Sequence, residues 1–202
     1  MGGINVELTI AFVRAGACKA ELAGRLSGMS DEPLAQKSRQ QILSRKDQSV
    51  YPDAPIIFCG YSPRCVETAR LIWPSPPIIV ERDLRPISYG AFEGKDSRRL
   101  TDDGRFLRWA SAKSAEAFPG GESPMAMQAR SVQAFGSVTA EMASKGIACA
   151  AVVSHLLVIQ AIFQRFCVPR PNFCNWEIAY GGCVMGTYDT MRATLEIKEK
   201  NK

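Results

Sequence analysis

The sequence predicts an α/β fold, a three-layer α/β/α sandwich in which a mostly parallel β-sheet lies between helices. Five short apolar runs have the composition of buried strands, at residues 8–13, 55–60, 77–80, 148–155 and 181–189. Helix-like segments separate them, at about residues 33–46, 64–72, 95–117, 123–145 and 156–167. Short buried strands that alternate with helices are typical of a parallel sheet covered by helices on both faces.

Each element follows from a local pattern. The first run, LTIAFV, leads into Arg14, and Gly16 permits a tight turn just beyond the strand end. The second run, PIIFCG, precedes a helix that opens near Arg64, and the sequence PGG at 119–121 marks a loop. ACAAVVSH and GGCVMGTYD are the last two strands. The charged end of the chain, EIKEKNK, is expected to fray, with residues 198–202 outside the fold.

The composition predicts one domain over residues 1–202. The chain has 202 residues, 46% of them hydrophobic, which is enough for one sizeable core. No apolar run has the ~18–20 residues of a membrane span, and the first residues lack a basic leader. We therefore expect a cytoplasmic protein with no membrane partner. The formal charge of +5 is mild and no aromatic residues interleave the basic ones, so we expect no nucleic acid partner. A homodimer is left open.

Seven cysteines and a single histidine, His155, limit the metal and redox chemistry. The cysteines are irregularly spaced, and no CxxC pair or Cys/His cluster occurs, which argues against structural zinc. We therefore expect no metal and no cofactor. An odd number of cysteines in apolar surroundings favours reduced thiols in a cytosolic protein.

Polar and charged side chains follow three of the predicted strands. Arg14 follows the first, Arg64 opens the helix after the second, and Ser154 and His155 follow the fourth. Ligands in such sheets bind outside the carboxyl ends of the strands, where guanidinium groups and helix N-termini favour phosphate oxygens. Taken singly, each arginine is better explained by a surface ion pair and His155 by an interior position. Their convergence predicts a site for a phosphorylated small molecule, or for inorganic phosphate or sulfate.

Six short motifs occur one after another along the chain. They are VRAG, GRLSGMSDEPL, RCVETA, YGAFEG, GGES and VSHLLVI. Together they resemble the histidine phosphatase superfamily, over about residues 6–189. The block DLRPISYGAFEGK looks most similar to the small bacterial phosphatases of the α-ribazole phosphatase type. The resemblance implies a phosphoglycerate mutase-like fold and, in an active member, phosphoric monoester hydrolysis.

The resemblance also implies roles for individual residues. In the family, a histidine at the end of the first strand is the nucleophile, two arginines and a second histidine hold the phosphoryl group, and a glutamate is the general acid. The matching positions for phosphoryl binding are Arg14, Arg64 and His155, which are all present. The nucleophile position is Ala15 and the acid position is Pro86, so both reactive groups are missing.

Three further positions depart from the family pattern. Cys18 stands at a threonine position, Glu21 at an asparagine position and Leu156 at a glycine position. Glu21 would either repel a phosphate in the pocket or pair with one of the arginines and close the empty site. Cys18 near Arg14 offers a candidate reactive thiolate, although it lies on the turn rather than at the strand end.

These departures favour a pseudoenzyme, a degenerate and catalytically impaired member that retains a phosphate-ester or anion-binding pocket. Loss of a central nucleophile lowers turnover by roughly 10⁶-fold in hydrolases. One alternative is an active phosphomonoesterase with rearranged catalytic groups, acting on small phosphate esters. Another is an engineered variant in which alanine replaces the nucleophile. Pro86, Glu21 and Leu156 are altered as well as Ala15, however, and four changes favour natural decay.

Overall fold

The computed structural model describes residues 6–100, 102–110, 116–170 and 177–200. Its centre is one sheet of six strands in the order β3-β2-β4-β1-β5-β6. The strands are β1 (Glu7–Arg14), β2 (Ile57–Cys59), β3 (Ile78–Val80), β4 (Cys149–Ser154), β5 (Cys183–Asp189) and β6 (Thr194–Lys200). The first four are parallel, whereas β5 and β6 are antiparallel to their neighbours. The predicted α/β fold is thus confirmed, with a mixed sheet.

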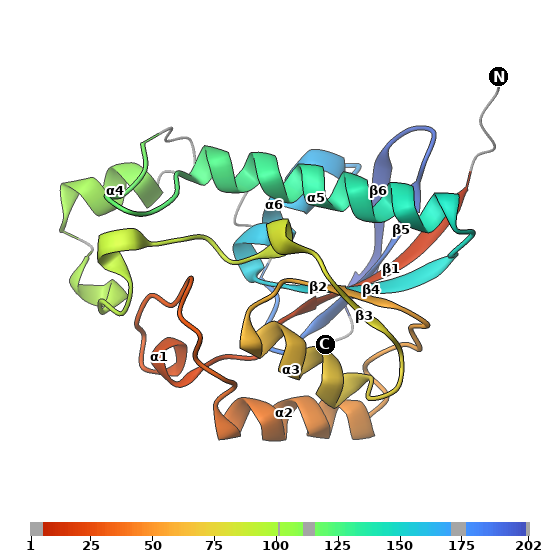
Figure 1. The fold of residues 1–202 in the computed structure, drawn as a ribbon, viewed down its shortest axis with the longest axis horizontal. Coiled ribbons are helices and arrows are strands. Elements are labelled where there is room, and N and C mark those ends of the chain that lie inside the picture. Colours follow the sequence, from red (N-terminus) through yellow and green to blue (C-terminus); the bar gives the residue numbers. More distant parts are fainter. Residues whose placement is uncertain (1–5, 101, 111–115, 171–176, 201–202) are drawn as a thin grey trace.

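Helices cover both faces of this sheet (Figure 1). One layer consists of α2 (Gln36–Asp47) and α3 (Pro63–Ile72), and the other of α5 (Pro124–Ser144) and α6 (Leu156–Phe166). Two short helices, α1 (Lys19–Leu22) and α4 (Gly104–Ala110), lie beyond the sheet at one end. Three 3₁₀ turns lie between β3 and α4 in the chain, and they are η1 (Arg82–Leu84), η2 (Gly90–Phe92) and η3 (Ser97–Arg99).

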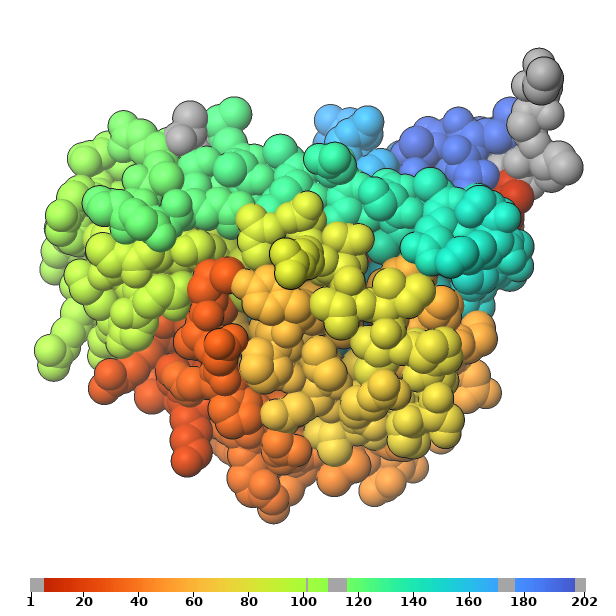
Figure 2. All heavy atoms as spheres, viewed as in Figure 1, coloured from red at the N-terminus to blue at the C-terminus, as the bar shows by residue number. Residues whose placement is uncertain are grey.

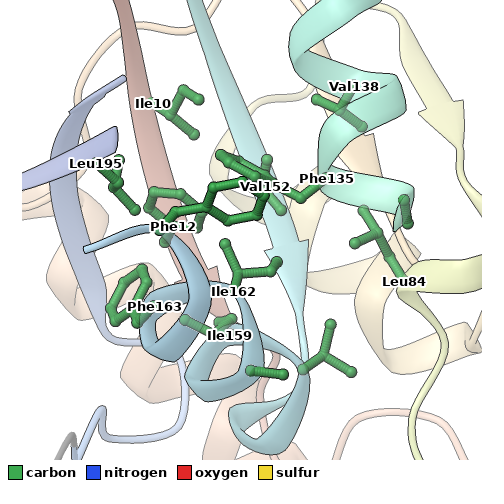
Figure 3. Packing of buried hydrophobic residues seen from close by; sticks show 14 of the residues in the cluster. Ile10, Phe12, Leu84, Phe135, Val138, Val152, Ile159, Ile162, Phe163 and Leu195 are labelled. Carbon is green, nitrogen blue, oxygen red and sulfur yellow. The ribbon is translucent and has the colours of Figure 1, made fainter. Parts of the chain in front are cut away.

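Alternate side chains of β1 pack into opposite layers, as the twofold period of a strand requires. Phe12 belongs to the larger core under α5 and α6, whereas Val13 belongs to the core under α2 and α3. Figure 3 shows Phe12 against Phe135 and Phe163, at ring-centroid distances of 5.7 and 5.0 Å. Buried apolar contact on both faces fixes the register of the central strands, and with it the positions of the residues at their carboxyl ends.

The predicted fraying of the C-terminal segment is wrong for residues 196–200, because they belong to the edge strand β6. Residues 201 and 202 lie outside the described residues. Leu195 is fully buried and Ile197 packs against the larger core. Between and after them lie Glu196 and Lys198, which are exposed. The apolar alternation therefore holds the strand against the core, while charged residues occupy the outer face of an edge strand, where they discourage further pairing.

The predicted helix over residues 95–117 is also wrong. The chain forms η3 and then α4, and residues 101 and 111–115 lie outside the described residues. The Asp96 side chain accepts the backbone N–H of Arg98, and the Asp103 side chain accepts that of Arg105. Such local hydrogen bonds satisfy backbone donors at the start of short turns and thereby compete with one continuous helix.

The described residues contain no helix that is both long and apolar enough to cross a bilayer. Within the same residues, no group of three His, Cys, Asp or Glu side chains is placed to hold a metal ion. The six described cysteines are free thiols, and Cys174 lies outside the described residues.

Candidate functional site

A small cavity of about 70 Å³ opens at the carboxyl ends of β1 and β4. It has room for a few water molecules or one small anion, since a single water needs roughly 10–15 Å³. Its walls come from these two strand ends, from the segments around α1 and η1, and from the chain before β5. The lining residues are Arg14, Ala15, Glu21, Ser27, Pro86, Ile87, Tyr89, His155, Leu156, Leu157 and Tyr180.

Long-range backbone pairing builds one wall of this region. The loop after α1 lies against the chain that follows η2, where Leu26 and Gly94 each donate to a carbonyl on the other segment. Glu93 accepts the backbone N–H groups of Gly28 and Met29. Figure 2 shows these two segments in contact at the surface, the first in orange-red and the second in yellow-green. Segments about 65 residues apart in the sequence thus meet beside the cavity.

The turn after β1 places Ala15 in the cavity wall. The Ala15 N–H donates to the Ser154 carbonyl at 2.8 Å, and the Gly16 N–H donates to Thr68 Oγ1 at 3.0 Å. A Cβ atom at Gly16 would lie 2.7 Å from a methyl carbon of Leu34 and 2.9 Å from one of Ile42, so a larger residue there would displace these two buried side chains. The position that carries the nucleophile in the resembled family therefore faces the cavity with a methyl group.

Arg14 contributes a guanidinium to the cavity. Its central carbon lies 3.6 Å from the centre of the Tyr180 ring, a cation–π contact. Its Nη1 donates to the Ile178 carbonyl at 2.7 Å. The aromatic face and this carbonyl hold the guanidinium at the end of β1, and a bound anion would meet its charge.

Arg64 takes a different position from the one expected, because it is fully buried and does not line the cavity. Its Nη1 and Nη2 donate to three backbone carbonyls of the loop after α1, those of Ser27, Gly28 and Ser30, at 2.9–3.1 Å. Its Nε has no hydrogen-bond partner and lies 3.7 Å from Glu21 Oε2. Arg64 therefore stands behind the cavity, where it holds a loop, and Glu21 is the nearer charge to a ligand.

The structure also places Ser154 and Cys18, two candidate site residues from the sequence. The Ser154 hydroxyl donates to the Leu84 carbonyl at 2.8 Å and is fully buried, outside the cavity lining. The Cys18 thiol donates to the Ser27 hydroxyl at 3.3 Å. Burial raises the pKa of Cys18 above its ordinary value, which is the reverse of the activated thiolate that the sequence offered as an alternative.

His155 occupies the N-cap position of α6, where its side chain makes no capping hydrogen bond, and it lines the cavity. Its Nε2 lies 3.1 Å from the Ser62 hydroxyl and 3.3 Å from the Cys65 sulfur. Burial first, and then the cations Arg64, Arg14 and Arg130, hold the pKa of His155 well below 6.5. The imidazole is therefore neutral at neutral pH and acts as a hydrogen-bonding group rather than as a cation.

The loop that carries Pro86 is fixed by a buried ion pair. Arg130 of α5 donates through Nε and Nη2 to both oxygens of Glu122, at 2.7 Å each. The same guanidinium donates to the carbonyls of Asp83, Arg85 and Pro86 at 2.7–3.0 Å. The acid position of the family is thus held at the cavity wall, but by a residue that has no proton to donate.

Sequence reasoning missed two tyrosines of the site and the anchoring role of Arg130. Tyr89 lies within the YGAFEG motif, but the motif did not indicate that this side chain lines the cavity. No sequence signal pointed to Tyr180. Burial first, and then the charge of Glu21, raises the pKa of both tyrosines. The Glu21 carboxylate is therefore close enough to make deprotonation of both hydroxyls less favourable.

Comparison with known proteins agrees with the family resemblance of the sequence. A family profile for the histidine phosphatase superfamily (branch 1) matches residues 10–199, and a search of curated proteins gave no match. The α-ribazole phosphatase from Shigella flexneri is 18% identical, with a TM-score of 0.81 and 96% of each chain covered. The phosphoglycerate mutase from Bacillus anthracis is 15% identical, with a TM-score of 0.78 and coverage of 96% of this chain and 93% of that one.

A third solved structure has the same fold, the phosphoglycerate mutase from Thermus thermophilus. It is 25% identical, with a TM-score of 0.70, and the match covers 96% of this chain and 98% of the mutase. The phosphoglycerate mutase-like fold is thus established, and the family profile spans nearly the whole sequence. The chain belongs to the histidine phosphatase superfamily.

Proposed function

We propose that this protein is a catalytically impaired histidine phosphatase that binds a small phosphate ester, or inorganic phosphate, in the cavity at the ends of β1 and β4. The observation that carries the proposal is the wall of that cavity. It retains Arg14 and His155, which can hold an anion, and has Ala15 and Pro86 where the family has its nucleophile and acid.

The retained groups suit binding. The Arg14 guanidinium is fixed and presents its charge at the cavity, and such groups bind phosphate oxygens strongly. Neutral His155 adds a ring nitrogen at the N-terminus of α6, where helix backbone also favours negative charge. No group at Ala15 can accept a phosphoryl group, and covalent catalysis requires one.

The alternative is an active phosphomonoesterase with a replacement nucleophile. The Ser62 hydroxyl, 3.1 Å from His155 Nε2, has the spacing of a nucleophile and its base. Against this role, Ser62 is buried and does not line the cavity. Cys18 is the other candidate, and burial raises its thiol pKa, which lowers its nucleophilic fraction.

Two measurements on the full chain test the proposal. Hydrolysis of p-nitrophenyl phosphate is followed from acid to neutral pH, and binding of inorganic phosphate is measured by calorimetry, each with Arg14→Ala as the matched control. We expect no turnover above the blank, and phosphate binding that Arg14→Ala abolishes. Turnover that Arg14→Ala removes would favour the active enzyme. If neither inorganic phosphate nor a small phosphate ester binds, the pocket is refuted.

A further inference from the structure

The cavity presents opposite charges on two of its walls. Arg14 lines it with a guanidinium and Glu21 lines it with a carboxylate. Because the cavity measures only about 70 Å³, a phosphate in contact with Arg14 also lies close to Glu21. A plain phosphate dianion therefore meets repulsion as well as attraction in this cavity.

The Glu21 charge is only partly neutralised by the protein. Its Oε2 accepts the Cys18 N–H at 2.9 Å and lies 3.7 Å from Arg64 Nε, which is too long for a hydrogen bond. The other Arg64 nitrogens are committed to backbone carbonyls. In the part of the chain that the structure describes, Glu21 Oε1 has no hydrogen-bond donor, so it is available to a ligand.

Aromatic rings accompany this carboxylate. Tyr89 and Tyr180 line the same cavity as Glu21, and its charge acts on both hydroxyls. A carboxylate beside aromatic rings favours an ammonium group through ion pairing and cation–π attraction. The Tyr180 ring already receives Arg14, which leaves Glu21 as the partner for a cation of the ligand.

We propose that the ligand is a small phosphate monoester that carries a cationic amine on its alcohol part. Its phosphate lies against Arg14 and His155, and its ammonium group lies against Glu21. Glu21 then determines specificity: it disfavours simple phosphate esters and favours zwitterionic ones. This inference rests on the proposed anion-binding function and adds the chemical class of the ester to it.

Two esters of equal chain length separate the amine from the phosphate. O-phosphoethanolamine and propyl phosphate share the phosphate and a three-atom tail, which ends in an ammonium in one and a methyl in the other. Calorimetry on the wild-type chain at pH 7 should show O-phosphoethanolamine binding at least about tenfold more tightly, the effect of one charge-assisted hydrogen bond.

Glu21→Gln should remove this preference, since it keeps an oxygen for the Cys18 N–H but loses the charge. Propyl phosphate should then bind more tightly than it binds the wild type, and O-phosphoethanolamine more weakly. Glu32→Gln is the matched control, because Glu32 accepts the Ala20 N–H of the same helix but does not line the cavity. That variant should keep the wild-type preference.

The wild-type comparison decides the inference even if Glu21→Gln fails to fold. Equal affinities for the two esters would overturn it and leave the proposed function intact. An equal loss of preference in Glu32→Gln would also overturn it, because net charge rather than Glu21 would then be the cause. If neither ester nor inorganic phosphate binds, the proposed function fails together with the inference.

Discussion

Replacement of Arg130 by methionine probes the anchor of the Pro86 loop. The guanidinium makes five hydrogen bonds, two to Glu122 and one each to three backbone carbonyls. Methionine keeps much of the side-chain volume but leaves Glu122 without its closest partner. The Arg130 and Glu122 side chains are only 9% and 12% exposed, and removal of one partner from such a buried pair costs about 3–5 kcal/mol.

The lower end of this range is expected, because a second cation remains nearby. Arg85 Nη2 lies 3.7 Å from Glu122 Oε1 and would move part of the way to compensate. We therefore predict that Arg130→Met lowers the free energy of unfolding by about 3 kcal/mol. Urea denaturation followed by tryptophan fluorescence measures this loss. The double variant Arg130→Met/Glu122→Leu should recover part of it, since the buried carboxylate is removed together with the cation.

Arg105→Met serves as the matched control. Its guanidinium pairs with Asp103 at an exposed position and lies 5.7 Å from the centre of the Phe92 ring, so the midpoint of unfolding should be almost unchanged. If Arg130→Met loses less than about 1 kcal/mol, the usual effect of an ordinary substitution, then the buried pair does not anchor the loop. An equal loss in Arg105→Met would lead to the same conclusion.

Three further predictions concern the cavity and the residues around it. The variant Ala15→His alone should cleave activated aryl phosphates slowly and alkyl phosphates hardly at all. Adding Pro86→Glu should raise alkyl ester turnover by ~10²–10⁴-fold, as a general acid does. Equal rates on both esters for the single variant would contradict this. The folded-state pKa of His155 lies well below 6.5, so the contribution of His155 to stability is complete above pH 6.5 and is lost as the pH falls toward the folded value. His155→Gln should therefore flatten the dependence of the unfolding free energy on pH in this range. An unchanged profile would contradict the prediction. Gly16→Ala should destabilise the fold by about 1–3 kcal/mol through overpacking. Gly136→Ala in α5, where a Cβ meets nothing within 4 Å, should stabilise the fold by up to about 1 kcal/mol. Thermal unfolding of both variants measures the two effects.

The central strands could be predicted because their sequences are apolar on both faces. The runs at 8–13 and 148–155 coincide closely with β1 and β4, which are covered by helices on either side. β6 was missed because TLEIKEK is highly charged, and only its pairing with β5 and the burial of Leu195 make it a strand. Tertiary context overrides composition at such an edge.

The site could be predicted at the level of backbone position but not of side-chain direction. The sequence placed Arg14, Arg64 and His155 at the carboxyl edge of the sheet, and the structure has them there. It could not indicate that the Arg64 guanidinium donates to the loop after α1, because the acceptors are backbone carbonyls some 35 residues away in the chain. Backbone acceptors carry no signature in the sequence.

The position of Arg64 in turn explains why Glu21 matters to the whole site. A fully buried guanidinium requires a counter-charge, and Glu21 Oε2, 3.7 Å from its Nε, supplies one. At an effective dielectric constant of ~20, this attraction is about 4 kcal/mol. Where the family has asparagine, as the resemblance implies, a bound phosphate would be the nearest anion to this arginine. Here the protein carries its own anion, so the charge open to a ligand moves from Arg64 to Arg14, and Glu21 itself becomes a contact that the ligand must match.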